Sequence, residues 1–309
     1  MAEAIEVRGL TKRFGETLAV DDLSFSVTEG RIVGFLGPNG AGKTTTLRVL
    51  LDLERATSGV TSIHGVAYHA LPDPGGTVGA VLDGGMLHPG RSGRNHLRAL
   101  AQAGGFDRGR VEELLELVGL KDAAHRRAGG YSLGMRQRLG IAAALLGDPA
   151  TVVLDEPVNG LDVEGIRWMR GMLLELAAQG KTVFVSSHLM SEIAQTATRL
   201  IVIGKGRLIA DTSVAEFIAS AAPASVRVRS SGQQALAGLL RAPDVTVSFA
   251  DDGALLVSGL AAERIGAIAA AAGIAVAELS TVETSLEDAF VDLTKDAVEY
   301  RAASFEEEK

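Results

Sequence analysis

The chain has no cysteine among its 309 residues, and aromatic side chains make up only 4% of it. The lack of cysteine excludes disulfide bonds and thiolate metal sites. Long apolar runs are also missing, since stretches such as Ile141–Leu146 fall far short of the ~20 residues that cross a bilayer. The Ala-rich stretch 266–277 is too short as well, and charged residues flank it. We therefore expect no membrane-spanning segment in this sequence.

Two other features are lacking. The N-terminus has no cationic and apolar leader, which predicts a protein that stays in the cytoplasm. Basic residues are not in excess, because 30 Lys and Arg stand against 38 Asp and Glu for a net charge of −8, and this argues against broad nucleic-acid binding. The length is sufficient for two domains.

The most informative stretch that is present is GPNGAGKTT, which directly follows the apolar, strand-like run Ile32–Leu36. A loop of this G-x4-G-K-T form turns its backbone N–H groups around phosphates, and the next helix points its positive end at the same anion. Lys43 can reach the outer phosphates and Thr44 can hold Mg²⁺. An ordinary glycine-rich turn would not explain Lys43 and Thr44 in register. The predicted phosphate-binding residues are Gly37, Pro38, Asn39, Gly40, Ala41, Gly42, Lys43, Thr44 and Thr45.

Two adjacent carboxylates follow a second apolar run. Val152–Leu154 predicts a buried strand, and Asp155 at its end can meet the Mg²⁺ held by Thr44. Glu156 comes next. Because adjacent strand residues face opposite ways unless the strand has ended, the two acids can be divided between a metal and a water molecule. A solvated acidic turn is the alternative.

These stretches belong to a series of motifs in a fixed order. After the phosphate loop come YSLGMRQRL (131–139), TVVLDEP (151–157), NGLD (159–162) and FVSSH (184–188). In that order they resemble the nucleotide-binding subunits of ABC transporters, from about Glu6 to about Phe217. The resemblance implies a P-loop α/β fold with a helical signature subdomain, ATP and Mg²⁺ as cofactors, and ATP hydrolysis.

The resemblance also implies roles for single residues. In the family, the residue at Glu156 polarises the attacking water and the residue at His188 contacts the γ-phosphate, so both are expected to be catalytic. Phe14 stands where the family stacks an aromatic ring on adenine, although by itself it would be assigned to the core. Asp162 of NGLD is expected at the nucleotide as well.

The signature YSLGMRQ departs from the commoner LSGGQ of the family, but Ser132 and Gly134 remain at the start of the predicted helix. A helix end can face a phosphate there. In the family that phosphate belongs to the opposite protomer, which implies a head-to-tail dimer with two composite sites. For Ser132 alone, an ordinary helix N-cap is the alternative.

Asp83 is the main departure from the family, because many relatives have glutamine at this place. An anionic carboxylate can ligate Mg²⁺ but cannot donate a hydrogen bond as glutamine does. Asp83 is therefore either a metal contact or a solvated loop acid. The following stretch, 86–98, lies in the region that receives the membrane partner in the family.

The predicted domain organisation has two parts. Residues 1–219 form the ABC ATPase domain, with a helical insertion at about 84–148, and residues 220–224 form a small-residue linker. Residues 225–298 show a β-α-β, β-α-β order, which predicts an α+β accessory domain with helices on one face of an antiparallel sheet. Its last helix is expected at Ser285–Thr294, and residues 299–309 are expected to be disordered.

The stretch SLEDAF (285–290) resembles the C-terminal end of ABC ATPases from drug and antibiotic exporters. The resemblance implies an ATPase on the cytoplasmic side of the membrane that powers efflux of a drug, antibiotic or lipid-like amphiphile. A separately encoded permease would make the substrate contacts. An importer ATPase and an ABC ATPase acting on ribosomes or DNA are alternatives, although a single ATPase unit without coiled-coil inserts argues against the latter. Glu156 and His188 argue against a module that only binds ATP.

Overall fold

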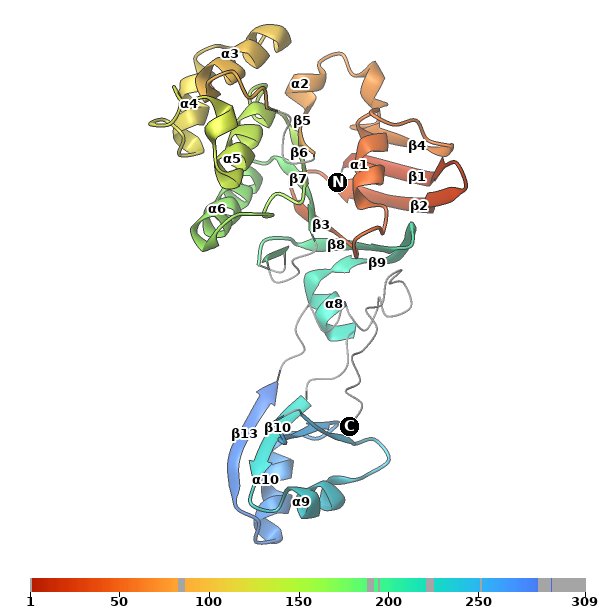
Figure 1. Cartoon of the computed structure of the whole chain (residues 1–309). Helices are drawn as coiled ribbons and strands as arrows, with labels where there is room; N and C mark the ends of the chain where they lie inside the picture. The colour runs from red at the N-terminus through yellow and green to blue at the C-terminus, as the bar shows by residue number, and fades with distance from the viewer. Residues whose placement is uncertain are drawn as a thin grey trace. The chain divides into compact units, whose positions relative to one another are not determined.

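The computed structural model describes residues 2–82, 87–187, 192–193, 195–220, 225–250, 252–282 and 290. The described chain divides after Val214 into two compact units (Figure 1). The predicted linker at 220–224, the helix at 285–294 and the tail at 299–309 lie largely or wholly outside the described residues. The predicted domain limits therefore stay predictions.

A six-stranded sheet in the order β5-β6-β7-β3-β8-β9 forms the centre of the first unit. The first five strands in that order run parallel, and β9 pairs antiparallel with β8. Strands β3, β6 and β7 are buried at every position, which is why their sequences read as continuous apolar runs. The strands are β3 (Ile32–Leu36), β5 (Val78–Val81), β6 (Thr151–Asp155), β7 (Thr182–Ser187), β8 (Arg199–Gly204) and β9 (Arg207–Ser213).

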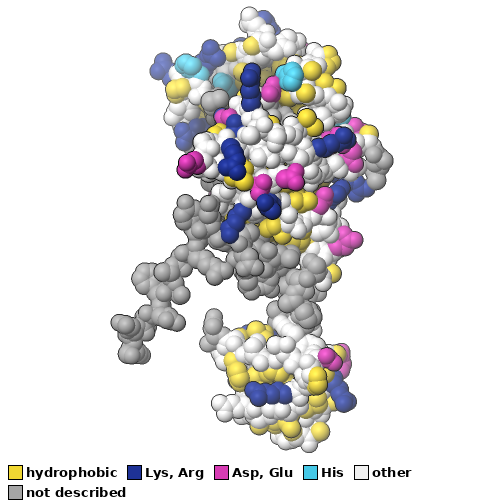
Figure 2. Space-filling view, turned by 90° about the vertical axis from the view of Figure 1, so that its right-hand side faces the viewer, with side chains coloured by type: hydrophobic (Ala, Val, Ile, Leu, Met, Phe, Trp, Pro, Cys, Tyr) yellow, Lys and Arg dark blue, Asp and Glu magenta, His cyan; other side chains and the backbone are white. Residues whose placement is uncertain are grey.

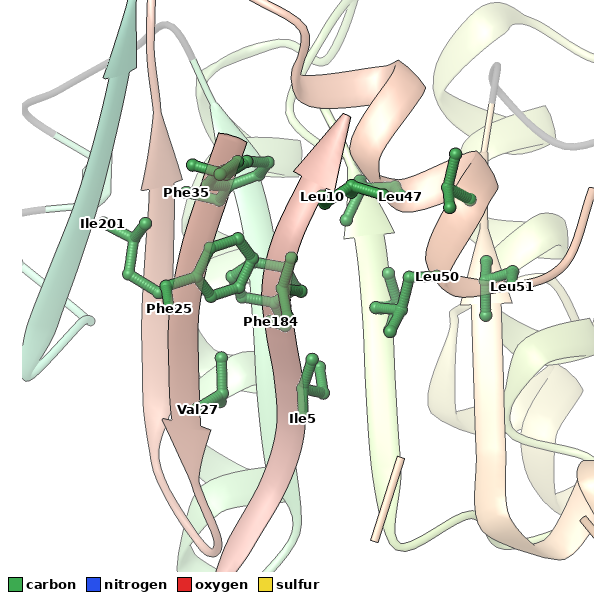
Figure 3. Packing of buried hydrophobic residues seen from close by; sticks show 14 of the residues in the cluster. Ile5, Leu10, Phe25, Val27, Phe35, Leu47, Leu50, Leu51, Phe184 and Ile201 are labelled. Atoms are coloured by element: carbon green, nitrogen blue, oxygen red, sulfur yellow. The ribbon is translucent and has the colours of Figure 1, made fainter. Parts of the chain in front are cut away.

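A three-stranded antiparallel sheet, in the order β2-β1-β4, packs against the central sheet. Three rings fill the space between the sheets, with Phe25 from β2 at 5.5 Å from Phe35 of β3 and 5.7 Å from Phe184 of β7, centroid to centroid (Figure 3). Leu47 and Leu50 of helix α1 join the same core. This core fixes the start of α1 relative to the ends of β3 and β7. The bounds are β1 (Glu3–Phe14), β2 (Thr17–Thr28), β4 (Ser58–Ile63) and α1 (Lys43–Leu50).

Helices fill the chain between β5 and β6, and Figure 1 shows them grouped apart from the three-stranded sheet. Serine caps begin two of them, with Ser92 Oγ accepting from Asn95 N at 3.3 Å and Ser132 Oγ accepting from Met135 N at 3.2 Å. The predicted fold, a P-loop α/β core with a helical signature subdomain, is confirmed. Among the described residues before Val214, the helices besides α1 are α2 (Pro74–Thr77), α3 (Gly93–Gly104), α4 (Arg110–Leu117), α5 (Leu133–Ala144) and α6 (Val163–Ala178), with short 3₁₀ turns at Tyr68–Ala70 and Ala128–Gly130.

The second unit begins with residues of α8 (Val214–Ser220) and contains a four-stranded antiparallel sheet in the order β11-β12-β10-β13. The chain order β-α-β-β-α-β with this strand order is that of ferredoxin-like folds. Helices α9 and α10 bury one face of the sheet, against side chains such as Val228 and Val257. The predicted α+β topology is confirmed. The elements are β10 (Ser225–Ser230), α9 (Gln233–Leu240), β11 (Thr246–Phe249), β12 (Leu255–Ser258), α10 (Ala262–Ala271) and β13 (Val276–Val282).

None of the helices in the described part of the chain is long and apolar enough to cross a membrane. On the face of the first unit that Figure 2 presents, both basic and acidic side chains lie at the surface.

Candidate nucleotide-binding site

The phosphate loop connects β3 to α1 and needs glycine at one position in particular. Gly42 has a φ of 99°, and a Cβ atom there would lie 2.5 Å from the carbonyl oxygen of Ala19 on β2. A larger residue would be strained and would push the two segments apart. The loop encloses a cavity of about 220 Å³, whose lining residues are Ala19, Asn39, Gly40, Ala41, Gly42, Lys43, Thr44, Thr45 and Glu156.

Lys43 places a buried positive charge inside this loop, with only 6% of its surface exposed. Its Nζ donates to the carbonyl oxygens of Gly37 at 2.7 Å and Pro38 at 3.3 Å. The same Nζ lies 3.5 Å from Oε1 of Glu156. The ammonium group is thus held where a phosphate on the loop would meet it.

Asp155 ends β6, and two hydroxyls orient its carboxylate. Thr44 Oγ1 donates to Oδ2 at 2.7 Å, and Ser186 Oγ donates to Oδ1. Ser186 lies directly opposite Asp155 in the register of β6 and β7. Ser186 was not among the predicted site residues, although the pairing of LDE with FVSSH on neighbouring parallel strands would have indicated a role for it.

Glu156 follows Asp155 with a φ of 48°, in the left-handed region that residues other than glycine rarely occupy. Its backbone N–H lies 3.2 Å from the carbonyl oxygen and 3.0 Å from Oγ of Ser186, and donates to them. This turn ends the alternation of the strand, so the two adjacent carboxylates have different neighbours. Asp155 meets Thr44, whereas Glu156 meets Lys43.

The residues present fit a nucleotide with Mg²⁺. Thr44 and Asp155 offer two oxygen atoms side by side, which are the ligands that Mg²⁺ prefers. Lys43 offers the cation, and the positive end of α1 begins at the same residue. Asp83 and His188, the other predicted metal and catalytic residues, lie outside the described residues.

Ser132, Gly134 and Asp162 line a different cavity of about 400 Å³. Ser132 caps α5 and Asp162 caps α6, where its Oδ1 accepts from Gly165 N at 2.8 Å. The N-termini of both helices therefore border one cavity, and its lining residues differ from those of the phosphate-loop cavity. The cap interpretation of Ser132 is confirmed, and the residues of the first turn, Leu133, Gly134 and Met135, line the cavity.

Phe14 does not belong to the hydrophobic core, because its side chain is 46% exposed at the end of β1. The Nζ of Lys12 lies 4.5 Å from the ring centroid. The hairpin of β1 and β2 also carries Ala19, which lines the phosphate-loop cavity. The ring is therefore available on an exposed strand end of the same hairpin.

The family models match the chain in two places. The model described as "ABC transporter" matches residues 20–159, and the model described as "Domain of unknown function (DUF8746)" matches residues 224–287. The first match covers the phosphate loop, the signature helix and both carboxylates. The second covers most of the second compact unit.

Relatives and solved structures agree with the first match. The chain is 40% identical to the bacitracin transport ATP-binding protein BcrA of Enterococcus faecalis, over 70% of this chain and 71% of the relative. It is 40% identical to the Nod factor export ATP-binding protein I of Burkholderia orbicola (strain AU 1054), over 67% of this chain and 70% of the relative. A solved ATP-binding subunit of an ABC transporter superposes with a TM-score of 0.64 and 25% identity, over 69% of this chain and 91% of the other. The chain belongs to the ATP-binding proteins of ABC transporters and is an ATPase.

Proposed function

We propose that this ATPase works as a head-to-tail dimer on the cytoplasmic side of the membrane and powers export through a separately encoded permease. The observation that carries the dimer is the separation of the two cavities within one chain. Lys43, Thr44 and Glu156 line one, with Asp155 hydrogen-bonded to Thr44, and Ser132, Gly134 and Asp162 line the other. We call the cavity lined by Ser132, Gly134 and Asp162 the signature cavity. A second copy of the chain would place its signature cavity against the nucleotide held by the first.

Within each composite site the residues divide the chemistry. When Mg²⁺ is bound, it neutralises the negative charge that develops on the phosphates during phosphoryl transfer. Thr44 and Asp155 would hold it, Lys43 would neutralise the outer phosphates, and Ser132 with the α5 N-terminus would face the γ-phosphate from the partner. Glu156 would accept the proton of the attacking water, and His188 would contact the γ-phosphate. Phe14 would stack on the adenine ring and Asp83 would approach the metal.

An apolar groove in the first unit supports docking of the permease. Leu53 and Leu100, which are 58% and 36% exposed, line it together with buried His96, and its volume is about 270 Å³. Leu87 and His96 of this groove belong to the stretch 86–98, which lies in the region that receives the membrane partner in the family. Leu100→Arg should weaken co-purification with the permease while ATP affinity stays unchanged.

The direction and class of cargo are inferred from the relatives. One relative is named for bacitracin transport and another for Nod factor export, and the SLEDAF stretch resembles exporter ATPases. We infer export of an amphiphilic drug, antibiotic or lipid-like molecule that contacts the permease alone. Residues 225–298 would form an accessory domain that supports the dimer or regulates it. An importer would instead be indicated by a solute-binding protein encoded next to this chain.

The decisive experiment uses Glu156→Gln. The amide is nearly isosteric, so ATP binding should stay intact while hydrolysis falls by at least the ~10²-fold expected from losing a general base. ATP would then hold two chains together, and the variant should elute as an ATP-dependent dimer from a sizing column. Adding Ser132→Arg should return it to monomer.

The matched control is Gln102→Arg, which adds the same side chain at an exposed position of α3. It should leave the Glu156→Gln dimer intact. A Glu156→Gln protein that remains monomeric in saturating ATP and Mg²⁺, or that hydrolyses ATP normally, would refute the composite site.

A further inference from the structure

Arg138 of α5 and Trp168 of α6 make a contact for which the proposed chemistry has no role. The guanidinium carbon of Arg138 lies 4.5 Å from the centroid of the Trp168 ring, and both side chains are half-buried. A cation over the face of an indole ring is the most favourable form of this interaction. The contact joins the signature helix to the helix that follows Glu156 and Asp162.

Both side chains also bind the end of a third helix. Arg138 Nη1 donates to the carbonyl oxygen of Val118 at 3.2 Å, and Trp168 Nε1 donates to that of Leu117 at 3.4 Å. Leu117 is the last residue of α4 and Val118 is its C-cap, so these are carbonyls that a helix leaves without an intrahelical partner. The negative end of the α4 dipole favours the guanidinium there. One point of contact therefore links α4, α5 and α6.

This contact lies beside the signature cavity. Arg138 lines the cavity itself, as does Gly119 with a φ of 69°. A Cβ atom on Gly119 would lie 3.1 Å from Arg138 Nη1, so glycine leaves room for the guanidinium. Arg138 comes six residues after the cap Ser132, and Trp168 comes six residues after the cap Asp162. The link thus lies about 9 Å along the axis from each capped end.

We propose that Arg138 and Trp168 are positioning residues that hold the capped ends of α5 and α6 in one fixed arrangement. Ser132, Gly134 and Asp162 then present a preformed surface to the nucleotide held by the other protomer. Preorganisation lowers the ordering cost of closing the dimer. The inference rests on the proposed composite site, and its tests separate the two.

The first test measures order in the isolated chain, without nucleotide or partner. Hydrogen exchange of the bonded backbone amides of Met135, Arg136, Gly165 and Ile166 should become faster in Trp168→Leu, because the capped ends lose their common restraint. Trp168→Phe keeps an aromatic face for Arg138 and should restore slow exchange at both ends. Unchanged exchange in Trp168→Leu would overturn the positioning role whatever the dimer does.

The second test measures dimer affinity in the Glu156→Gln background with saturating ATP and Mg²⁺. Trp168→Leu should weaken the dimer about tenfold, whereas the affinity of the monomer for a fluorescent ATP analogue should change by less than about twofold. A purely structural defect would lower thermal stability and the active fraction but would not change the dimer affinity of the folded protein. Trp168→Phe should regain most of the dimer affinity.

A double-mutant cycle decides whether the two residues act together. Arg138→Met keeps the length of the side chain and removes its charge, and combined with Trp168→Leu it should cost no more than either change alone. Additive losses would show that the two side chains act independently and would refute the pair. Trp168 is the only tryptophan of the chain, so a shifted emission in Arg138→Met would verify the contact.

The outcomes separate the two proposals. Failure of Glu156→Gln to dimerise would refute the composite site while the exchange measurement still decides the positioning role. A normal Glu156→Gln dimer that Trp168→Leu leaves unchanged would refute the positioning role alone.

Discussion

The central sheet of the first unit and the sheet of the second unit show how strand direction decides where reacting groups gather. In the first unit, β3, β6 and β7 run parallel and end at one edge, so the phosphate loop, Asp155 and Ser186 meet there. In the second unit every strand pair is antiparallel, so strand ends alternate between two edges. Residues that follow strands are brought together in the first unit and separated in the second.

The central sheet of the first unit and the sheet of the second unit also differ in how they are buried. Helices and a second sheet cover the parallel strands on both faces. The antiparallel sheet buries Val226 and Val228 under its helices, whereas the alternate residues Arg227 and Arg229 form ion pairs with Asp252 and Glu278. Exposed ion pairs of this kind stabilise a fold little. The reacting groups described above all lie in the first unit.

The sharpest test of this difference compares Leu47→Ala with Leu236→Ala. Both leucines are fully buried, one in α1 and the other in α9, and each change should cost about 2–5 kcal/mol. Leu47→Ala should also weaken ATP binding, because α1 carries Lys43 and Thr44. Leu236→Ala should leave ATP affinity unchanged. Calorimetry with and without ATP measures both effects, since ATP raises the unfolding temperature of the unit that binds it.

Lys43→Ala should lower ATP affinity by about 10- to 100-fold, because hydrogen bonds to a charged group contribute about 1.5–3 kcal/mol. Equilibrium binding of a fluorescent ATP analogue measures the loss. Lys181→Ala is the control, since Lys181 binds Asp148 and the carbonyl of Pro149 away from the loop. Equal effects of the two substitutions would contradict a specific role for Lys43.

Ser186→Ala should slow hydrolysis about tenfold while ATP affinity changes little. The change removes one hydrogen bond from Asp155 and one from the N–H of Glu156, and a tenfold loss corresponds to about 1.4 kcal/mol. Thr182→Val is the control, because it removes another buried hydroxyl from β7, one that accepts from Gly30 N at 3.0 Å. Steady-state kinetics should show a lower kcat for Ser186→Ala alone.

The smallest expected effect is a dependence of thermal stability on pH, between pH 7.5 and 5.5, that is confined to the first unit. All six histidines lie at or before position 188, and burial, followed by the charges of Arg91 and His88, lowers the pKa of His96 from 6.5. Below pH 6.5 the unfolded chain then binds more protons than the folded one, so the stability of the first unit falls as the pH falls. Melting curves from pH 7.5 to 5.5 should show this shift, and His96→Gln should reduce it. An equal shift in the melting temperature of the second unit would contradict the assignment of this pH dependence to His96.

Local patterns were sufficient for much of this protein. The phosphate loop, the helix that begins at Lys43, the buried strand before Asp155 and the α+β order of the second unit all follow from short-range rules for turns, caps and periodicity. Such rules depend on residues close together in the chain. The sequence by itself thus determined the family, the order of the elements and the candidates for the reacting groups.

Only the tertiary structure decided how those candidates meet. The φ of 48° at Glu156 cannot be read from an apolar run followed by two acids, and it sets the two carboxylates toward different neighbours. Ser186 meets Asp155, and Arg138 meets Trp168, about 30 residues apart along the chain in each pair. These contacts depend on the register of parallel strands and on how helices pack across the sheet. Both are set by burial of the whole core, which no local pattern contains.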